Sequence, residues 1–298
     1  MNRREFVAAS VTASVAAAAA GSVRADARQG LAAEATDRPS DFPVERVSGR
    51  LKQSVCRWCY GGMPLDDLCS HAAKMGFKSV ELLGEKEWSI PAKHGLTCAL
   101  ANGPTTIPQG WNRLEHHDKF VKESERLLPL VKEAGIPQMI VFSGNRAGQA
   151  DSEGLKNCAI GLKRITPLAE KLGVTVVMEL LNSKVDHHDY QCDHTAWGVE
   201  LVKQVGSPRF KLLYDIYHMQ IMEGDVIRTV TENLEHINHF HTGGVPGRHE
   251  LDGSQELQWA TICRAIVEKG FSGYLAQEFI PTRDPMTSLR EAFELCDV

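Results

Sequence analysis

Four strand-like segments of the sequence each end in an acidic or imidazole side chain: VTVVME at residues 174–179, FKLLYD at 210–215, HINHFH at 236–241 and GYLAQE at 273–278. Their last residues lie 36, 26 and 37 positions apart, which is about the length of one strand with one helix. Segments that stay largely apolar up to their last residue are typical of parallel strands covered on both faces. The series therefore predicts repeated β–α units.

The rest of the chain extends this alternation of strands and helices toward its N-terminus. A glycine follows several predicted helices, as Gly76 and Gly173 do, which is the usual way for a helix to end. Eight strands with helices between them predict an α/β fold, the (β/α)8 TIM barrel. The alternative is an open, doubly wound sheet, which usually carries a GxGxxG phosphate loop that this sequence lacks. The remaining strand candidates are 54–56, 79–82, 97–101 and 138–142, and the helix candidates are 64–75, 112–134, 152–172, 193–205, 224–234, 255–269 and 285–295.

The N-terminal segment has the pattern of an export signal. The pair Arg3-Arg4 precedes an Ala/Val-rich run at 7–20, and the residues ADA at 25–27 offer a signal-peptidase site. Adjacent arginines before a weakly apolar run indicate the twin-arginine route, and therefore a periplasmic protein. We expect an export signal at 1–27, a linker or N-terminal arm at 28–50, and a single TIM barrel catalytic domain at 51–298.

The composition excludes several classes of protein. With 33 Lys and Arg against 38 Asp and Glu, the net charge of −5 gives no overall positive field for nucleic acid. With 43% apolar and 24% charged residues, the chain does not resemble a protein inserted in a membrane. Its 8 cysteines are too few for a disulfide scaffold, and Cys56 and Cys59 form an isolated CxxC that we interpret as small core residues.

The residues at the last four strand ends together predict a metal site. In a barrel the carboxyl ends of all strands meet at one mouth, where three carboxylates would repel one another without a cation. Carboxylates and an imidazole are hard or borderline donors, which favours one divalent Mn, Mg or Co ion. Each residue alone is better explained as a strand-end cap or a surface ion pair. The predicted ligands are Glu179, Asp215, His241 and Glu278.

Other polar residues follow the same strand ends. His218 lies one helical turn after the predicted ligand of the sixth strand, where it could contact a substrate oxygen or only the backbone. Arg248 lies in a loop rich in Gly and Pro and offers a fork for carboxylate or polyol oxygens, or an ion pair with Glu250. Glu81 after the second strand and His187 after the fifth are candidates for positions beside the site.

Three motifs resemble the hydroxypyruvate isomerase family of the xylose isomerase-like TIM barrels: LYDIYHMQIMEGD at 213–225, HFH at 239–241 and VPGRHE at 245–250. The resemblance covers residues 52–298 approximately. It implies that the four predicted ligands hold the metal ion. It also implies that Glu179 and Glu278 form an acid/base pair. His218 and Arg248 would contact the substrate.

The expected chemistry is the transfer of a proton between neighbouring carbons. It requires an acid/base pair and a cation that stabilises the enediolate. We therefore predict a metal-dependent isomerase of a small hydroxycarbonyl or sugar substrate, with the chain either monomeric or a homo-oligomer. A ketose 3-epimerase or inosose dehydratase is the alternative, because ketose epimerases carry His at the position of His241, where hydroxypyruvate isomerases usually carry Gln. A non-enzymatic periplasmic sugar-binding protein is less favoured, because sugar binding needs no divalent ion.

Overall fold

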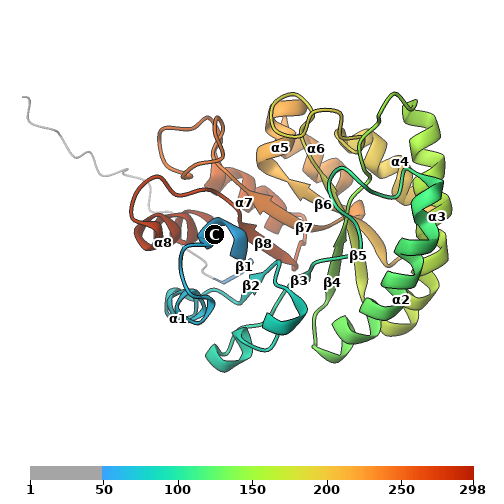
Figure 1. The fold of residues 1–298 in the computed structure, drawn as a ribbon. Helices are drawn as coiled ribbons and strands as arrows, with labels where there is room; N and C mark the ends of the chain where they lie inside the picture. The colour runs from blue at the N-terminus through green and yellow to red at the C-terminus, as the bar shows by residue number, and fades with distance from the viewer. Residues whose placement is uncertain (1–48) are drawn as a thin grey trace, which may run out of the picture. The chain divides into compact units, whose positions relative to one another are not determined.

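A computed structural model describes residues 49–298, so the predicted export signal and nearly all of the predicted arm lie outside the described residues. Eight parallel strands form one sheet in the order β2-β1-β8-β7-β6-β5-β4-β3 (Figure 1). This arrangement confirms the predicted (β/α)8 barrel. The strands are β1 Lys52–Cys56, β2 Ser79–Glu81, β3 Leu100–Ala101, β4 Gln138–Val141, β5 Thr175–Leu180, β6 Phe210–Asp215, β7 Ile237–Thr242 and β8 Tyr274–Gln277.

Helices surround the strands as an outer layer (Figure 1). Gly76 and Gly173 end the first and third of them in the left-handed conformation, at φ 104° and φ 72°, as the sequence predicts. The helices are α1 Leu65–Met75, α2 His117–Glu133, α3 Asp151–Leu172, α4 Thr195–Val205, α5 Ile216–Met222, α6 Val226–Asn233, α7 Trp259–Glu268 and α8 Pro285–Cys296.

The hydrophobic core has two parts. The larger part lies between the strands and the helices, and the smaller part fills the inside of the barrel with Leu100, Ile140, Val177 and Leu213. Leu82 and Phe142 pack against this inner group but are only partly buried. The inner group therefore supports apolar side chains that reach the mouth of the barrel.

The barrel closes most weakly between β2 and β3. Their connection, for which the sequence predicts no helix, holds two short 3-10 turns, η2 Glu85–Glu87 and η3 Pro91–His94. β3 is shorter than the predicted 97–101, and it meets the β2 side through the isolated parallel bridges Ser79↔Thr97 and Leu83↔Ala101.

Two helix predictions need correction. The long helix predicted at 112–134 begins only at His117, because residues Leu114–His116 form a 3-10 turn before it. Helix α5 is absent from the sequence prediction, although it starts directly after β6. Asp215 explains why α5 starts there, because it ends the strand and its carboxylate also caps the helix by accepting a hydrogen bond from the backbone N–H of His218 at 3.2 Å.

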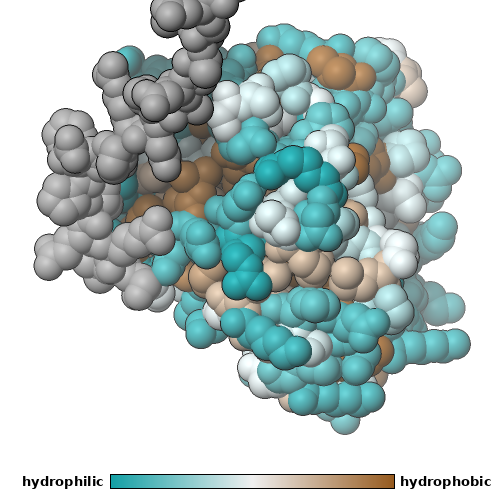
Figure 2. Space-filling model, turned by 90° about the vertical axis from the view of Figure 1, so that its left-hand side faces the viewer, coloured by the Kyte–Doolittle hydropathy of each residue, from teal (hydrophilic) through white to brown (hydrophobic). Residues whose placement is uncertain are grey.

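The two ends of the described chain meet beside β1 (Figure 1). The backbone N–H of Gly49 donates to Asp297 Oδ1 at 2.6 Å, and Arg50 Nε donates to the carbonyl of Val298 at 3.0 Å. Much of the visible surface on the side of α1 and α8 is hydrophilic, with hydrophobic side chains in limited patches (Figure 2). Within residues 49–298, no helix has the length and apolar character needed to cross a membrane.

Candidate active site at the carboxyl ends of the strands

The barrel brings the four predicted ligands together. Glu179 lies in β5, Asp215 ends β6, His241 lies in β7 and Glu278 directly follows β8. One ligand-type atom from each of them lies within 4.8 Å of the others, and all four side chains are buried. The parallel register explains this, because Asp215 pairs with His241 on the neighbouring strand. Segments up to 99 residues apart in the chain thus meet at one point of the mouth.

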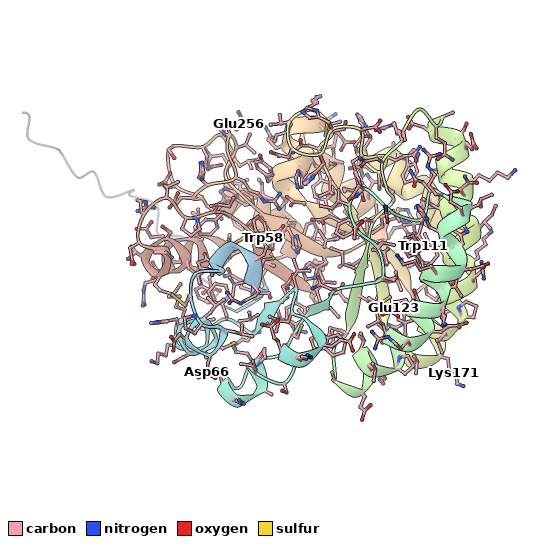
Figure 3. The ribbon with its side chains drawn as sticks, in the orientation of Figure 1. Trp58, Asp66, Trp111, Glu123, Lys171 and Glu256 are labelled. Atoms are coloured by element: carbon pink, nitrogen blue, oxygen red, sulfur yellow. The ribbon has the colours of Figure 1, made fainter. Side chains whose placement is uncertain are left out.

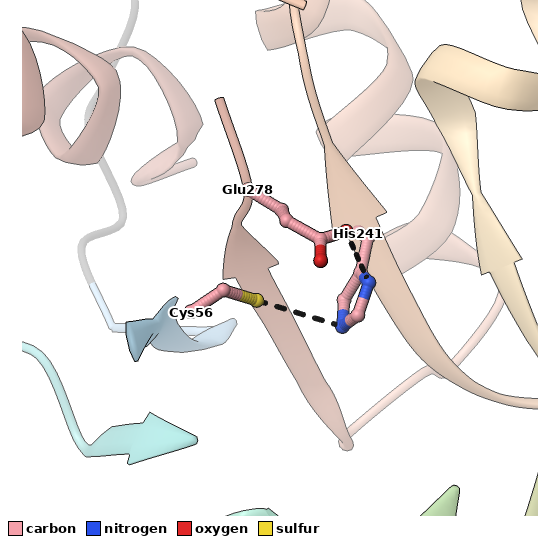
Figure 4. Close-up of side chains that lie close together, drawn as sticks. All are labelled: Cys56, His241 and Glu278. Carbon is pink, nitrogen blue, oxygen red and sulfur yellow. Dashed lines mark hydrogen bonds and ion pairs between the residues drawn. The ribbon is translucent and has the colours of Figure 1, made fainter. Parts of the chain in front are cut away.

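His241 lies at the centre of this group. Its Nδ1 is 2.6 Å from Glu278 Oε2 and 3.3 Å from Glu179 Oε1, while its Nε2 is 3.8 Å from the Sγ of Cys56 (Figure 4). Burial alone would lower the pKa of this imidazole, but the charge of Glu278 raises it well above its usual value. Cys56 is buried, as expected of a core residue, yet it also borders the site.

Glu81 holds the far side of the same imidazole. Its Oε1 lies 3.0 Å from His241 Nε2 and 2.9 Å from His239 Nε2, and the side chain is fully buried. Burial would raise the pKa of Glu81, but the charge and hydrogen bond of His239 and the hydrogen bond of His241 outweigh it and lower the pKa to about 2. Glu81, whose place the sequence leaves open, therefore orients the ring of His241 and leaves Nδ1 facing the carboxylates.

Arg248 is the second cation of the site. Its Nη2 lies 2.7 Å from Asp215 Oδ2 and 2.5 Å from Glu278 Oε2, and its Nε donates to the carbonyl of Glu278 at 3.0 Å. The guanidinium carbon also lies over the rings of Trp58 and Tyr217, at 5.6 and 5.0 Å from their centroids. The aromatic contacts and the hydrogen bonds from Nη2 and Nε together fix its plane.

The alternative partner of Arg248 considered from the sequence, Glu250, lies elsewhere. The Glu250 carboxylate accepts hydrogen bonds from the backbone N–H groups of Thr282 at 2.7 Å and Arg283 at 3.1 Å. It also accepts a hydrogen bond from the hydroxyl of Ser288 at 2.9 Å. Glu250 therefore ties the loop that carries Arg248 to the segment that follows Glu278.

His218 is a neutral, fully buried neighbour of Arg248. Its Nε2 lies 2.6 Å from Arg248 Nη1, and its Nδ1 lies 2.6 Å from the side-chain amide of Asn182. Burial, reinforced by the charge of Arg248, lowers the pKa of His218 well below its usual value. The ring of His187 lies 5.2 Å from that of His218, so both imidazoles reach the site.

The pKa values of the three carboxylates are shifted in different directions. Burial, with repulsion from Glu278, raises the pKa of Glu179. Burial also raises the pKa of Asp215, to about 7, against the opposing charge of Arg248. Burial would raise the pKa of Glu278 too, but His241 and Arg248 hold it well below its usual value. Two glutamates whose pKa values move in opposite directions are the pattern of an acid/base pair.

A cavity of about 350 Å³ opens in front of these residues. Its polar wall, as we call it, consists of Glu179, His218, Arg248 and Glu278, and its apolar wall consists of Leu82, Ile107, Ile140, Phe142 and Leu181. Trp58, from the 3-10 turn η1 Arg57–Tyr60, stands between the walls and donates its indole N–H to Glu278 Oε1 at 2.6 Å. The sequence does not predict that Trp58 or the apolar wall lines a cavity, because apolar side chains at strand ends are usually interpreted as residues of the hydrophobic core.

The donor set fits a divalent cation. Glu179, Asp215 and Glu278 supply carboxylate oxygens around one point, and His241 supplies an imidazole nitrogen. The Nδ1 atom of His241 is buried beside two of these carboxylates without a hydrogen bond of good geometry. A buried nitrogen in that position is suited to bind a metal ion.

Comparisons with known proteins show the family and the fold of the chain. The sequence profile of the xylose isomerase-like TIM barrel family matches residues 69–297. A 2-oxo-tetronate isomerase of Cupriavidus necator is 29% identical over 72% of this chain and 86% of its own length. A hydroxypyruvate isomerase of Escherichia coli is 31% identical over 37% of this chain and 44% of its own length. A solved structure described as an AP endonuclease of family 2 from Brucella melitensis shares the fold, with a TM-score of 0.74 at 23% identity over 80% of this chain and 97% of its own.

Proposed function

Because the chain belongs to the xylose isomerase-like TIM barrel family, we propose that it is a metal-dependent isomerase of a small hydroxycarbonyl or sugar-like substrate. The observation that carries the proposal is the pair Glu179 and Glu278, which face one cavity with pKa values moved in opposite directions. The two relatives named as isomerases of hydroxypyruvate and 2-oxo-tetronate support the same reaction class.

Four side chains would hold the metal ion: Glu179, Asp215, His241 and Glu278. When bound, a divalent ion such as Mn, Mg or Co would polarise the carbonyl and hydroxyl oxygens of the substrate. Asp215 and His241 mainly hold this arrangement, because Asp215 is fixed by the backbone of His218 and His241 is fixed by Glu81.

The glutamates move the proton. One removes it from the hydroxyl-bearing carbon beside the carbonyl, and the other returns a proton to the former carbonyl carbon, while the proton of the hydroxyl group passes to the former carbonyl oxygen. Glu278 is tightly held, because Trp58 donates to one of its carboxylate oxygens and Arg248 contacts the other. His218 lines the cavity, and its contact with a substrate oxygen stays a prediction, because its two ring nitrogens already lie 2.6 Å from Arg248 Nη1 and from the side-chain amide of Asn182.

A ketose 3-epimerase is the second candidate. The observation that favours it is His241, which takes the position that the resemblance associates with ketose epimerases. The same two glutamates would then remove a proton from one face of a carbon and return one to the opposite face. The products separate the two candidates, because an isomerase moves the carbonyl and an epimerase leaves it in place.

The test is proton exchange with solvent. Metal-stripped protein and protein loaded with Mn²⁺, Mg²⁺ or Co²⁺ would be incubated in D₂O with hydroxypyruvate, ketoses and inososes, and deuterium at the α carbon followed by NMR. We expect incorporation with at least one substrate, and its loss on chelation. If the purified protein binds a sugar but binds no metal ion and causes no deuterium incorporation into any substrate, it is a sugar-binding protein and the proposal fails.

A further inference from the structure

The cavity in front of the glutamates is larger and more apolar than a three-carbon substrate needs. Its volume of about 350 Å³ would hold roughly a dozen water molecules, and it lies in the range of pockets for complete small ligands. Proton transfer uses only the polar wall. Leu82, Ile107, Ile140, Phe142 and Leu181 line the remaining space without a charged group among them.

The apolar wall is a rigid surface. Leu82 and Phe142 pack against the group that fills the inside of the barrel, and Ile140 belongs to that group. Leu82 directly follows β2 with φ 57°, a left-handed conformation that is unfavourable for a leucine. The fold thus keeps a strained residue that presents its side chain at this cavity, and such strain tends to occur at functional sites.

The apolar wall offers few partners to hydroxyl groups. Outside the polar wall and Trp58, the described polar side chains that line the cavity are Asn102 and His187, and the Nδ2 of Asn102 already lies 3.4 and 3.3 Å from the carbonyls of Leu82 and Leu83. A polyol chain placed there would lose its hydrogen bonds to water without replacing them. An apolar group placed there would release water from both surfaces.

We propose that the substrate carries an apolar ring or chain next to its hydroxycarbonyl group, and that this part packs on the apolar wall. The inference rests on the proposed function, because the polar wall must hold the reacting end. Trp58 extends the surface at the boundary of the two walls, since its ring lines the cavity and remains 47% exposed. An aromatic substituent would contact both this ring and that of Phe142.

Three matched compounds test the preference through exchange. They are hydroxypyruvate and its derivatives with a hydroxymethyl or a benzyl group on the hydroxyl-bearing carbon. We expect kcat/KM for deuterium exchange to be about tenfold or more higher for the benzyl compound than for the other two, because only the benzyl group fills the apolar wall. Equal or faster exchange with hydroxypyruvate or the hydroxymethyl compound would overturn the inference and leave the proposed function standing.

Binding tests the preference without turnover. Calorimetry would compare 3-phenyllactate with glycerate, which differ only in a phenyl group against a hydroxyl group. We expect 3-phenyllactate to bind about tenfold more tightly, and Phe142→Asn to remove most of that difference while glycerate binding changes less than threefold. Leu82→Gly is the second variant, because it removes an apolar side chain and also relieves the strained φ.

The control is Ile160→Asn, because Ile160 is an apolar side chain on α3 that is 43% exposed and does not line the cavity. It should leave both affinities unchanged. Glycerate binding as tightly as 3-phenyllactate in the unchanged protein would refute the inference. Tighter binding of 3-phenyllactate without exchange of any compound would refute the proposed function and leave the apolar preference of the cavity supported.

Discussion

The two walls of the cavity are built in different ways from the same barrel. The polar wall comes from the ends of β5 to β8 and is held by ion pairs and hydrogen bonds among buried groups. The apolar wall comes mainly from the β2, β3 and β4 side and is held by packing on the inside of the barrel. The comparison teaches that the charged and the apolar side chains of one mouth come mainly from different strands, which is the arrangement that our two proposals require. Changes in the polar wall should alter turnover, and changes in the apolar wall should alter substrate preference.

The largest effect is expected where the polar wall loses its acid/base pair. Glu179→Gln and Glu278→Gln each keep the shape of the side chain but cannot carry the proton, so kcat should fall by about a thousandfold or more. Thermal unfolding should still show a folded barrel. The measurement is deuterium exchange with the best substrate, at saturating metal.

Glu256→Gln is the matched control for these two variants. Glu256 is exposed at the edge of the molecule (Figure 3), accepts a hydrogen bond from Gln220 at 3.0 Å, and does not line the cavity. Its kcat should match that of the unchanged protein. Full activity in both glutamate variants would show that Glu179 and Glu278 do not transfer the proton.

Arg248→Lys should have the next largest effect. Lysine keeps the charge but cannot contact Asp215 and Glu278 together while lying over the rings of Trp58 and Tyr217. Loss of these charge-assisted contacts should cost about 3 kcal/mol, or roughly a hundredfold in kcat/KM. The preference for 3-phenyllactate over glycerate should survive, because the apolar wall is intact. Unchanged kcat/KM in this variant would mean that the contacts of the Arg248 guanidinium with Asp215 and Glu278 do not contribute to catalysis.

The sequence predicts the polar wall far better than the apolar wall, for a physical reason. Burying Glu179, Asp215 or Glu278 at the end of an apolar strand is costly without a partner, so each stands out in the sequence. Leu82 and Phe142 do not stand out, because an apolar residue at a strand end is equally suited to the core. Whether such a side chain faces the core or a cavity depends on how neighbouring strands meet, and the sequence pattern does not contain that information.

The fold shows the same limit. The repeated strand pattern predicts all eight strands of the barrel. It misses helix α5, because Asp215 serves both as the last residue of a strand and as a helix cap. For Glu250 it offers only the nearby Arg248 as a partner, since the atoms that Glu250 accepts from lie more than 30 residues away. Local periodicity predicts elements, and long-range hydrogen bonds decide their details.

Glu250 should affect stability more than chemistry. Burial would raise its pKa, but hydrogen bonds from the backbone and hydroxyl of Thr282 and from Ser288 lower the pKa to about 2, from an ordinary 4.5. Since the folded protein favours the charged form, this stabilisation is present above pH 4.5 and is lost as the pH falls toward 2. Glu250→Gln should lower the free energy of unfolding by about 2 kcal/mol at pH 7, and the difference should shrink at pH 3.

Denaturant unfolding at pH 7 and pH 3 measures this effect. Glu291→Gln is the control, because Glu291 forms an exposed ion pair with Arg283 at 2.7 Å, and such pairs contribute little. A loss of stability for Glu250→Gln that is the same at both pH values would show that its hydrogen bonds do not depend on its charge.

Trp58→Phe is the smallest change and tests the boundary between the walls. It keeps an aromatic ring at the cavity but removes the N–H that donates to Glu278 Oε1 at 2.6 Å. A lost hydrogen bond to a charged group should reduce kcat by about tenfold, since roughly 1.4 kcal/mol corresponds to that factor. Affinity for 3-phenyllactate should change less than threefold, because the ring surface remains.

Trp88→Phe is the matched control, because the indole N–H of Trp88 donates to the carbonyl of Leu83 at 3.1 Å and the residue does not line this cavity. Both activity and affinity should stay near those of the unchanged protein. If Trp58→Phe instead lowered affinity for 3-phenyllactate and left kcat unchanged, Trp58 would belong to the apolar wall alone. A fall in kcat with affinity preserved would mean that one side chain serves both walls, with its N–H positioning the glutamate and its ring completing the apolar surface.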